Sequence, residues 1–317
     1  MADIVTITPN PSVDLSFSVD RLVDTVKLRC ARPRKDAGGG GINVARVLHR
    51  LGSDCTALYL AGGAAGACLG ELLDAEQVPR TCIEVAGETR ENVTVLDEST
   101  HREYRFVLPG PQVTDLEWQR CLDDLETIDP LPRYVVASGS LPPGIPTDFY
   151  ARVARWARAR DVRMALDASG EALSAALDEG VFLVKPSLDE LSGLVGRLLT
   201  TPEHWREAAR QLVQRGRAHG VALTLGSRGA VFATPEGVIG LPALPVEVVS
   251  AVGAGDSFLA AMIWALDHDA DSKEALRYAI AAGSAAVRNR GTTLCDAADV
   301  VRLYRDSCAL APVGEVG

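Results

Sequence analysis

The chain has 317 residues and a formal net charge of −10, with 47% hydrophobic and 23% charged residues. This acidic balance argues against general nucleic-acid binding, which needs a basic excess. No stretch reaches the roughly 18 apolar residues of a membrane span, and the start, MADIVTITPN, lacks the basic head and apolar run of a secretory signal. Seven scattered cysteines without a CxxC pair indicate small buried residues in a reducing cytoplasm, not a disulfide framework or a zinc site.

Short β-branched runs alternate with segments of helical periodicity along the chain. The predicted strands are 3–8, 134–137, 162–167, 181–184 and 221–225, and the predicted amphipathic helices are 148–161 and 204–220. This alternation predicts right-handed crossovers and a mostly parallel sheet that is covered on both faces. We therefore expect an α/β fold in a single domain over 1–317, with an irregular end at 311–317.

Two regions, 13–34 and 89–110, instead alternate polar and apolar residues, which predicts hairpins with one wet face. The two excursions could pair into a small β-sheet that serves as a lid or a subunit contact. Lys27 and Arg29 would share one face of a strand, and Arg90 and Arg105 lie in the second region. Arginine binds phosphate through two N–H groups at once, whereas an edge strand protected by charge is the alternative that we expect for Arg32, Arg34 and Arg102.

A run of four glycines, 38–41, precedes Asn43 and an apolar helical pattern. Glycine lets the backbone approach a ligand closely. The dinucleotide-binding fingerprint fails because Val44 stands where its third glycine is needed, and a P-loop motif is absent from the sequence. By itself the run fits a ligand loop and a plain turn equally well.

The stretch AVGAGDSFLA (251–260) places two glycines and an acid at the start of an apolar helix. Gly253 and Gly255 let backbone N–H groups converge into an anion pocket. Asp256 could simply stabilise the helix N-terminus. The whole stretch is better explained by phosphoryl transfer, in which Asp256 is the base for an acceptor hydroxyl beside the bound phosphate.

Two further segments, VKPSLDE (184–190) and TLGSRGA (224–230), each follow a predicted strand. Ligands in open α/β sheets bind at such carboxyl ends. Glu190 could hold Mg²⁺ through water or be a first-turn helix acid. The glycines of the second segment could cradle a nucleotide or merely turn the chain.

Taken in order, TPNPSVD, GGGGINVAR, SGSLPPG, VKPSLDE, TLGSRGA and VGAGDSF resemble the ribokinase-like (PfkB) family of carbohydrate kinases, from about residue 4 to 293. The resemblance implies a ribokinase-like sheet with a β-sheet lid, and ATP-dependent transfer to a sugar hydroxyl with Mg²⁺. The segments KLRC, YRFVLPG and SGEALSAAL resemble the 6-phosphofructokinase branch of the family. In that branch the lid strands also build a homodimer, so a homodimer is implied here.

The resemblance also implies roles by position. Asp256 would be the base, and Gly253, Ala254 and Gly255 would form the anion hole. The sugar hydroxyls would meet Asp14, Gly39, Gly40 and Asn43, and the sugar's phosphate would meet Arg90, Arg105, Ser140 and, from a lid strand, Lys27. The nucleotide would meet Lys185, Ser187, Thr224, Gly226, Gly229 and Asn289, and Glu190 would serve the metal. Ser187 replaces the usual Asn, and Ala251 replaces the branch's Thr, which affects the expected nucleotide affinity.

The expected reaction is conversion of fructose 6-phosphate to fructose 1,6-bisphosphate. Fructose 1-phosphate (a 1-phosphofructokinase) and tagatose 6-phosphate (a tagatose-6-phosphate kinase) remain rivals, because the same arginines suit all three. A non-catalytic sugar-phosphate sensor is a second class, disfavoured by Asp256 and its glycines and weakly favoured by Ser187. A kinase of nucleosides or unphosphorylated sugars is a third, disfavoured by Arg90 and Arg105, since a neutral sugar needs no such cations.

Overall fold

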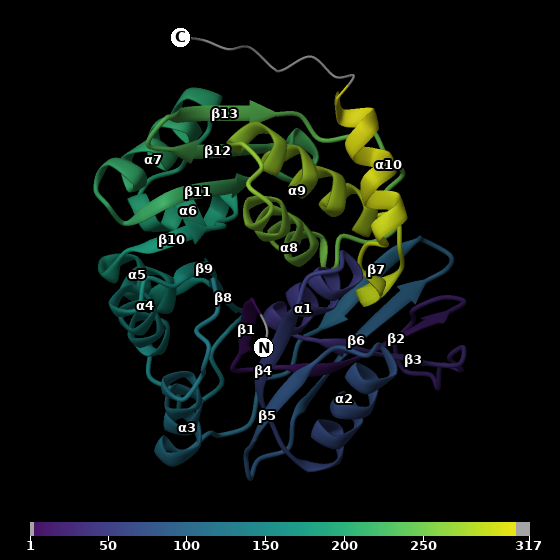
Figure 1. Cartoon of the computed structure of the whole chain (residues 1–317). Helices are drawn as coiled ribbons and strands as arrows, with labels where there is room; N and C mark the ends of the chain where they lie inside the picture. The colour runs from purple at the N-terminus through teal and green to yellow at the C-terminus, as the bar shows by residue number, and fades with distance from the viewer. Residues whose placement is uncertain (1–2, 309–317) are drawn as a thin grey trace.

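The computed structural model describes residues 3–308, which form two β-sheets and the helices that pack on them (Figure 1). The strands of the large sheet are β1 (Ile4–Thr8), β4 (Cys55–Ala61), β5 (Arg80–Glu84), β8 (Tyr134–Ser138), β9 (Arg163–Asp167), β10 (Val181–Val184), β11 (Ala218–Thr224), β12 (Ala230–Thr234) and β13 (Gly237–Leu241). Their order is β13-β12-β11-β10-β9-β8-β1-β4-β5. Only β12 and β13 run antiparallel to their neighbours, so the expected mostly parallel α/β sheet is confirmed.

Helices cover both faces of this sheet. They are α1 (Gly40–Arg50), α2 (Gly63–Ala75), α3 (Asp115–Glu126), α4 (Phe149–Ala159), α5 (Gly170–Glu179), α6 (Leu188–Val195), α7 (Pro202–Gln214), α8 (Ala254–Asp267), α9 (Ser272–Ala286) and α10 (Ala297–Cys308). One apolar cluster contains side chains of α1, α2, α8, α9 and α10, and the other contains those of α3 to α7. Ile4 belongs to the first cluster and Val5 to the second, because successive side chains of a strand point to opposite faces.

The predicted boundaries agree with the structure to within two residues, except that helix 204–220 extends too far and strand 221–225 begins three residues too late. The prediction 204–220 was too long, because α7 ends at Gln214 and β11 already begins at Ala218. Gly216, with φ 68°, lies between them and stops the helix. Segment 311–317 lies outside the described residues. Within 3–308, none of the helices combines the length and the apolarity needed to cross a bilayer.

A second, four-stranded sheet has the order β3-β2-β6-β7, and we call it the lid sheet or lid after its expected role. Its strands are β2 (Ser12–Val19), β3 (Arg34–Gly38), β6 (Arg90–Asp97) and β7 (Arg102–Phe106). The two excursions pair through β2 and β6, which run parallel, so the predicted small sheet beside the main one is confirmed. Figure 1 shows it at the edge of the molecule, near α1 and α2.

The first excursion differs from its prediction in the middle. Residues 20–33 form an irregular connection between β2 and β3, and β3 starts only after Pro33, whose ring removes a backbone donor. Lys27 and Arg29 lie in this connection and are exposed. The prediction that they share one face of a strand was therefore wrong.

The cysteines also differ in part from expectation. All seven are free thiols, as predicted, and Cys55, Cys121 and Cys295 are buried. Cys30 and Cys82 are exposed, as is Cys308, so the expectation of uniformly buried cysteines was wrong. The apolar clusters already hold many alanines and branched residues, so these positions did not need to be in the core.

Candidate active site

A cleft of about 280 Å³ opens where the lid sheet faces the carboxyl ends of β8 and β9 and the start of α8. Strand β1 lies between β4 and β8 in the large sheet, so the chain leaves the middle of the sheet in both directions. Ligands bind at such switch points in open α/β sheets. Predicted site residues that line the cleft are Asp14, Gly39, Gly40, Asn43, Arg90, Arg105, Ser140, Glu190, Gly253 and Asp256.

The start of α8 has the conformation of an anion pocket. Gly253 is the N-cap of α8 with φ 72°, and a Cβ atom there would come within 2.3 Å of Leu294 Cδ2, so a larger residue would strain the backbone and displace the Leu294 side chain. The N–H groups of the first helical turn have no partner within the helix, and the helix dipole adds partial positive charge there. The geometry of residues 253–255 therefore suits an incoming phosphoryl group.

Asp256 lies in the same first turn and faces α1. Its Oδ2 accepts a hydrogen bond of 2.8 Å from Asn43 Nδ2, a residue 213 positions away in the chain. Burial raises the pKa of Asp256 to about 6, and the charges of Asp167 and Asp14 act in the same direction. The Asn43 hydrogen bond and the Lys185 charge oppose that shift. A carboxylate with this pKa is ionised at neutral pH yet more basic than usual, which suits a general base.

Lys185 lies directly behind this turn. Its Nζ is 3.1 Å from Asp167 Oδ2, and a Cβ atom on Gly255 would come within 3.3 Å of the same Nζ. Burial disfavours the ammonium and is the largest single influence, but the charge and hydrogen bond of Asp167, together with the charges of Asp256 and Glu190, outweigh it and raise the pKa of Lys185. Burial also raises the pKa of Asp167, against the effect of Lys185. The sequence analysis missed Asp167, although it is the last residue of a predicted strand and so stands where site residues are expected.

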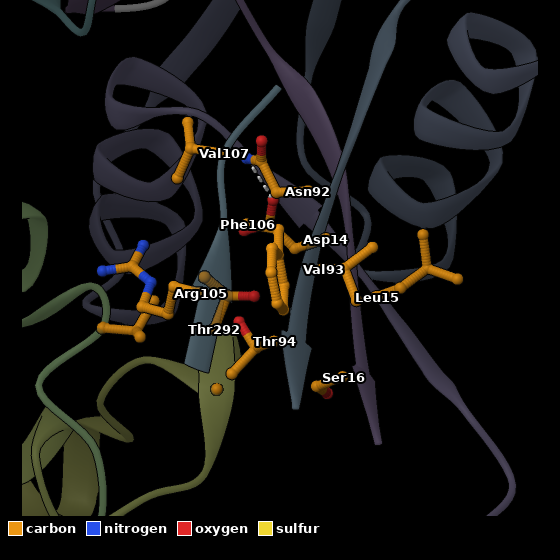
Figure 2. A pocket seen from close by; sticks show the side chains of 12 residues that line it. Asp14, Leu15, Ser16, Asn92, Val93, Thr94, Arg105, Phe106, Val107 and Thr292 are labelled. Carbon is orange, nitrogen blue, oxygen red and sulfur yellow. Dashed lines mark hydrogen bonds between the residues drawn. The ribbon is translucent and has the colours of Figure 1, made fainter. Parts of the chain in front are cut away.

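Asp14 projects into the cleft from β2 with one carboxylate oxygen occupied. Its Oδ1 accepts hydrogen bonds from Ser12 Oγ at 2.7 Å and from Asn92 Nδ2 at 3.0 Å. Figure 2 shows Asp14 and Asn92 side by side on neighbouring lid strands, with Arg105 across from them. Its second oxygen can accept from a sugar hydroxyl. Sequence reasoning missed Ser12 and Asn92 because their pairing depends on the β2–β6 register.

The cations at the lid end of the cleft are held differently from Lys185. The half-buried Arg90 guanidinium donates to the carbonyl oxygens of Asn10 at 2.9 Å and Leu108 at 3.0 Å. Burial lowers the pKa of Arg90, while Asp14 opposes the shift, and the group stays charged at any physiological pH. Asn10 also donates to Ser140 Oγ at 3.1 Å. Arg105 is exposed on β7, and Lys27 is not among the residues that line the cleft.

The residues expected at the nucleotide lie beside one another at neighbouring strand ends. Ser187 is the N-cap of α6, and it forms a reciprocal capping box with Glu190, in which Ser187 N donates to Glu190 Oε2 at 2.7 Å. Ser187 pairs with Thr224 in a β-bridge. Gly226 and Gly229, with φ 60° and 98°, form the turn after β11. The hydroxyl of Ser187 thus does the capping that an Asn would do.

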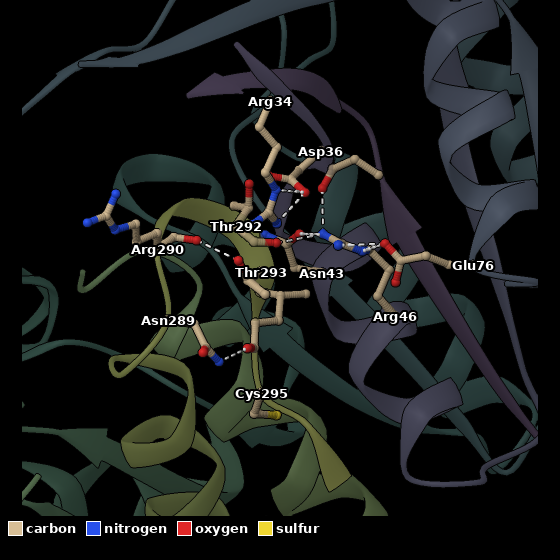
Figure 3. A network of polar contacts seen from close by, with 12 residues as sticks. Arg34, Asp36, Asn43, Arg46, Glu76, Asn289, Arg290, Thr292, Thr293 and Cys295 are labelled. Atoms are coloured by element: carbon tan, nitrogen blue, oxygen red, sulfur yellow. Dashed lines mark hydrogen bonds and ion pairs between the residues drawn. The ribbon is translucent and has the colours of Figure 1, made fainter. Parts of the chain in front are cut away.

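Asn289 belongs to a polar network that fixes the loop 289–295 against α1 (Figure 3). Its Nδ2 donates to the carbonyl oxygen of Leu294 at 2.7 Å. The fully buried Arg46 donates to Thr292 O at 3.1 Å and forms an ion pair with Glu76 at 2.6 Å. The side chain of Asn289 is therefore engaged in the loop, and its contact with a nucleotide stays a prediction. Arg46 was missed, although it ends the GGGGINVAR stretch, because its partners Glu76 and Thr292 are far from it in the sequence.

The carboxylates of the cleft suit a Mg²⁺ ion that keeps water ligands better than a metal ion enclosed by protein ligands alone. Glu190 and Asp167 both line the cleft. Within residues 3–308, no cluster of three or more His, Cys, Asp or Glu side chains is placed to hold a metal. Mg²⁺ commonly uses one or two carboxylates and takes its remaining ligands from water and substrate phosphates. The donor set is consistent with that kind of site.

Comparisons with known proteins agree with this arrangement. The model of the pfkB family carbohydrate kinases matches residues 4–299. The ATP-dependent 6-phosphofructokinase isozyme 2 of Mycobacterium tuberculosis (strain ATCC 25618 / H37Rv) is 44% identical over 313 residues, which are 98% of this chain and 92% of that protein. A 1-phosphofructokinase of Haloferax volcanii is 36% identical over 299 residues, which cover 94% and 95%. The crystal structure of phosphofructokinase-2 from Escherichia coli in complex with substrates and products superimposes with a TM-score of 0.92 at 40% identity, covering 96% of this chain and 99% of that one. The chain therefore belongs to the PfkB family of carbohydrate kinases.

Proposed function

We propose that the protein is an ATP-dependent 6-phosphofructokinase, which transfers the γ-phosphoryl group of ATP to the 1-hydroxyl of fructose 6-phosphate. One observation supports this most directly: a single cleft is lined by Asp256 in the first turn of α8 and by Arg90 and Arg105 at its lid end. Asp256 and the start of α8 suit phosphoryl transfer to a hydroxyl, and the two arginines suit a sugar that already carries a phosphate. Because ATP is the donor, we place the reaction in the cytoplasm.

In this mechanism Asp256 accepts the proton of the attacking sugar hydroxyl. The oxygen of that hydroxyl bonds to the γ-phosphorus, and the bond between the γ-phosphorus and the oxygen that links it to the β-phosphate breaks. The N–H groups at the start of α8 stabilise the charge on the moving phosphoryl group, and Lys185 adds positive charge behind them. Asp14 and Asn43 orient the sugar hydroxyls. Mg²⁺ held near Glu190 and Asp167 would neutralise charge on the nucleotide phosphates.

A coupled ADP-release assay across five acceptors tests the proposal. We expect kcat/KM to be highest for fructose 6-phosphate and lower for fructose 1-phosphate and tagatose 6-phosphate. Fructose and ribose should fall by about 100-fold or more, because they leave the arginines unpaired. A higher value for either rival sugar phosphate would reassign the protein to that activity. Binding of sugar phosphates without any turnover would support the sensor instead.

We also propose that a second copy of the chain covers the lid. The lid and its 20–33 connection carry exposed apolar side chains, among them Val26 at 61% and Val107 at 60% exposure. Exposed apolar side chains that gather on one part of a protein mark an interaction site, and a homodimer would bury those of this sheet symmetrically. Sedimentation should give twice the chain mass of 33.6 kDa for the wild type and for Val301→Asp on α10, and a lower average mass for Val26→Asp. A monomeric wild type would refute the dimer.

A further inference from the structure

A hydrogen bond joins the lid to the turn that precedes α8. Ser250 Oγ lies 2.8 Å from Glu103 Oε2, across 147 residues of sequence. Ser250 is only 3% exposed. Glu103 is half-buried, whereas its neighbours on and after β7, residues 102 and 104–109, are exposed. Glu103 is thus the residue of this strand that packs against the main part of the protein.

The chemistry of the two groups fixes the direction of the bond. An ionised carboxylate can only accept, so the Ser250 hydroxyl donates to Glu103. The Ser250 oxygen is then free to accept, and the backbone N–H of Val252 donates to it at 3.3 Å. The result is a polarised chain from the Val252 amide through a hydroxyl to a charge, and hydrogen bonds to charged groups are the stronger kind.

The turn held by this chain leads directly into the anion pocket. The backbone N–H groups of Val249 and Ser250 donate to Val287 O at 2.8 and 3.1 Å, which docks the turn on the end of α9. Gly253, the N-cap of α8, follows Val252. A shift of Ser250 would therefore move the residues that present the anion-binding amides.

The same lid strand, β7, carries Arg105, which is expected to bind the phosphate of the sugar. Arg105 stands two positions after Glu103, so both side chains leave the same face of β7. Arg105 lines the cleft together with Val107 and Val252. These three residues also surround a cavity of about 10 Å³ under the lid (Figure 2), which holds no more than a single water. Arg105 and Val107 therefore share one cavity with Val252, which lies two positions after Ser250.

We propose that Glu103 and Ser250 form a latch that sets the position of the lid over the cleft and couples the grip of Arg105 on the sugar phosphate to the anion-binding turn. Both are positioning residues, since neither lines the cleft. Their role in substrate binding rests on the proposed function, whereas the mechanical coupling of lid and turn does not.

A double-mutant cycle measures the coupling. Glu103→Ala and Ser250→Ala should each raise the KM for fructose 6-phosphate by about 10-fold, as expected for loss of one charge-assisted hydrogen bond, with a smaller change in the KM for ATP. The double variant should be no worse than either single variant, because each removes the same interaction. Glu103→Gln keeps an acceptor oxygen and should recover most of the loss. Multiplying effects in the double variant, or an equal rise in the KM for ATP, would overturn the latch.

Hydrogen exchange of the substrate-free protein gives a readout that is independent of activity. Amides of residues 102–106 should exchange faster in Glu103→Ala and Ser250→Ala, and equally so in the double variant. The control is Glu98→Ala, which removes a lid carboxylate whose side chain makes no hydrogen bond to any residue in 3–308. Unchanged exchange in both single variants refutes the latch. If wild-type protein fails to phosphorylate fructose 6-phosphate, the proposed function fails and the latch is judged on exchange alone.

Discussion

The charged side chains at the ends of β8 and β9 and at the start of α8, which we call the floor of the cleft, are more buried and more firmly bonded than those of the lid. At the floor, Asp256 accepts a hydrogen bond from Asn43. Lys185 lies behind the residues that line the cleft, is 6% exposed, and has its Nζ 3.1 Å from Asp167 Oδ2. On the lid, Arg105 is exposed on an edge strand, and the Arg90 guanidinium donates to the backbone carbonyl oxygens of Asn10 and Leu108. Groups that act on the moving phosphoryl need fixed geometry and low dielectric, whereas groups that recognise the sugar must let it enter. Damage to the floor should therefore lower kcat, and damage to the lid should raise KM.

Substitution of the floor carboxylate should have the largest effect. Asp256→Asn removes the base and keeps the shape, so kcat should fall by about 10²–10⁴-fold with little change in either KM. The matched control is Glu203→Gln, which neutralises another first-turn acid, on α7, away from the cleft. Near-normal turnover of Asp256→Asn in the ADP-release assay would mean that Asp256 only stabilises the start of α8.

Substitution on the lid should affect binding instead. Arg90→Ala should raise the KM for fructose 6-phosphate by about 10- to 100-fold, the range for hydrogen bonds to a charged group, and leave the KM for ATP nearly unchanged. Arg102→Ala removes an exposed cation from the same sheet that does not line the cleft, and it should have little effect. An Arg90→Ala variant with the ATP constant altered instead would break the distinction between floor and lid.

The pH dependence of kcat/KM should report the floor. Because burial raises the pKa of Asp256 to about 6 and a base must be ionised, activity should fall about tenfold per pH unit below that value and level off above it. A sugar phosphate also titrates near pH 6. Asn43→Ala removes a hydrogen bond that favours the ionised form, so it should move only the enzyme's pKa, and upward. Profiles that coincide for the two proteins would assign the titration to the substrate.

The smallest effect is expected at Ser187, the N-cap of α6, which stands where the family resemblance leads us to expect Asn. Ser187→Ala removes the N-cap of α6 and should lower the free energy of unfolding in urea by about 1 kcal/mol. Ser187→Asn keeps a capping side chain and should leave stability nearly unchanged. If Ser187→Ala left stability intact but raised the KM for ATP, Ser187 would be a nucleotide contact and not a helix cap.

Local patterns carried much of the site. The glycine–acid stretch at 253–256 predicted a helix start with an anion pocket; α8 begins there, and the anion pocket stays a prediction. Strand-end positions pointed to Lys185 and Glu190. A pattern argument failed for Lys27. The alternation of polar and apolar residues predicted a strand beyond Val19, but the chain there forms a loop that runs to Pro33.

By itself, the sequence determined the α/β class, five strands of the large sheet, the two excursions that form the small sheet and the start of the helix that would carry the chemistry. These follow from periodicity and from the conformational freedom of glycine, which act over a few neighbouring residues. Only the tertiary structure decided that Asn43 holds Asp256, that Lys185 pairs with Asp167 and that Glu103 meets Ser250. Such pairs depend on how helices and sheets pack across long separations in the chain, and no local pattern encodes which side chains will face one another.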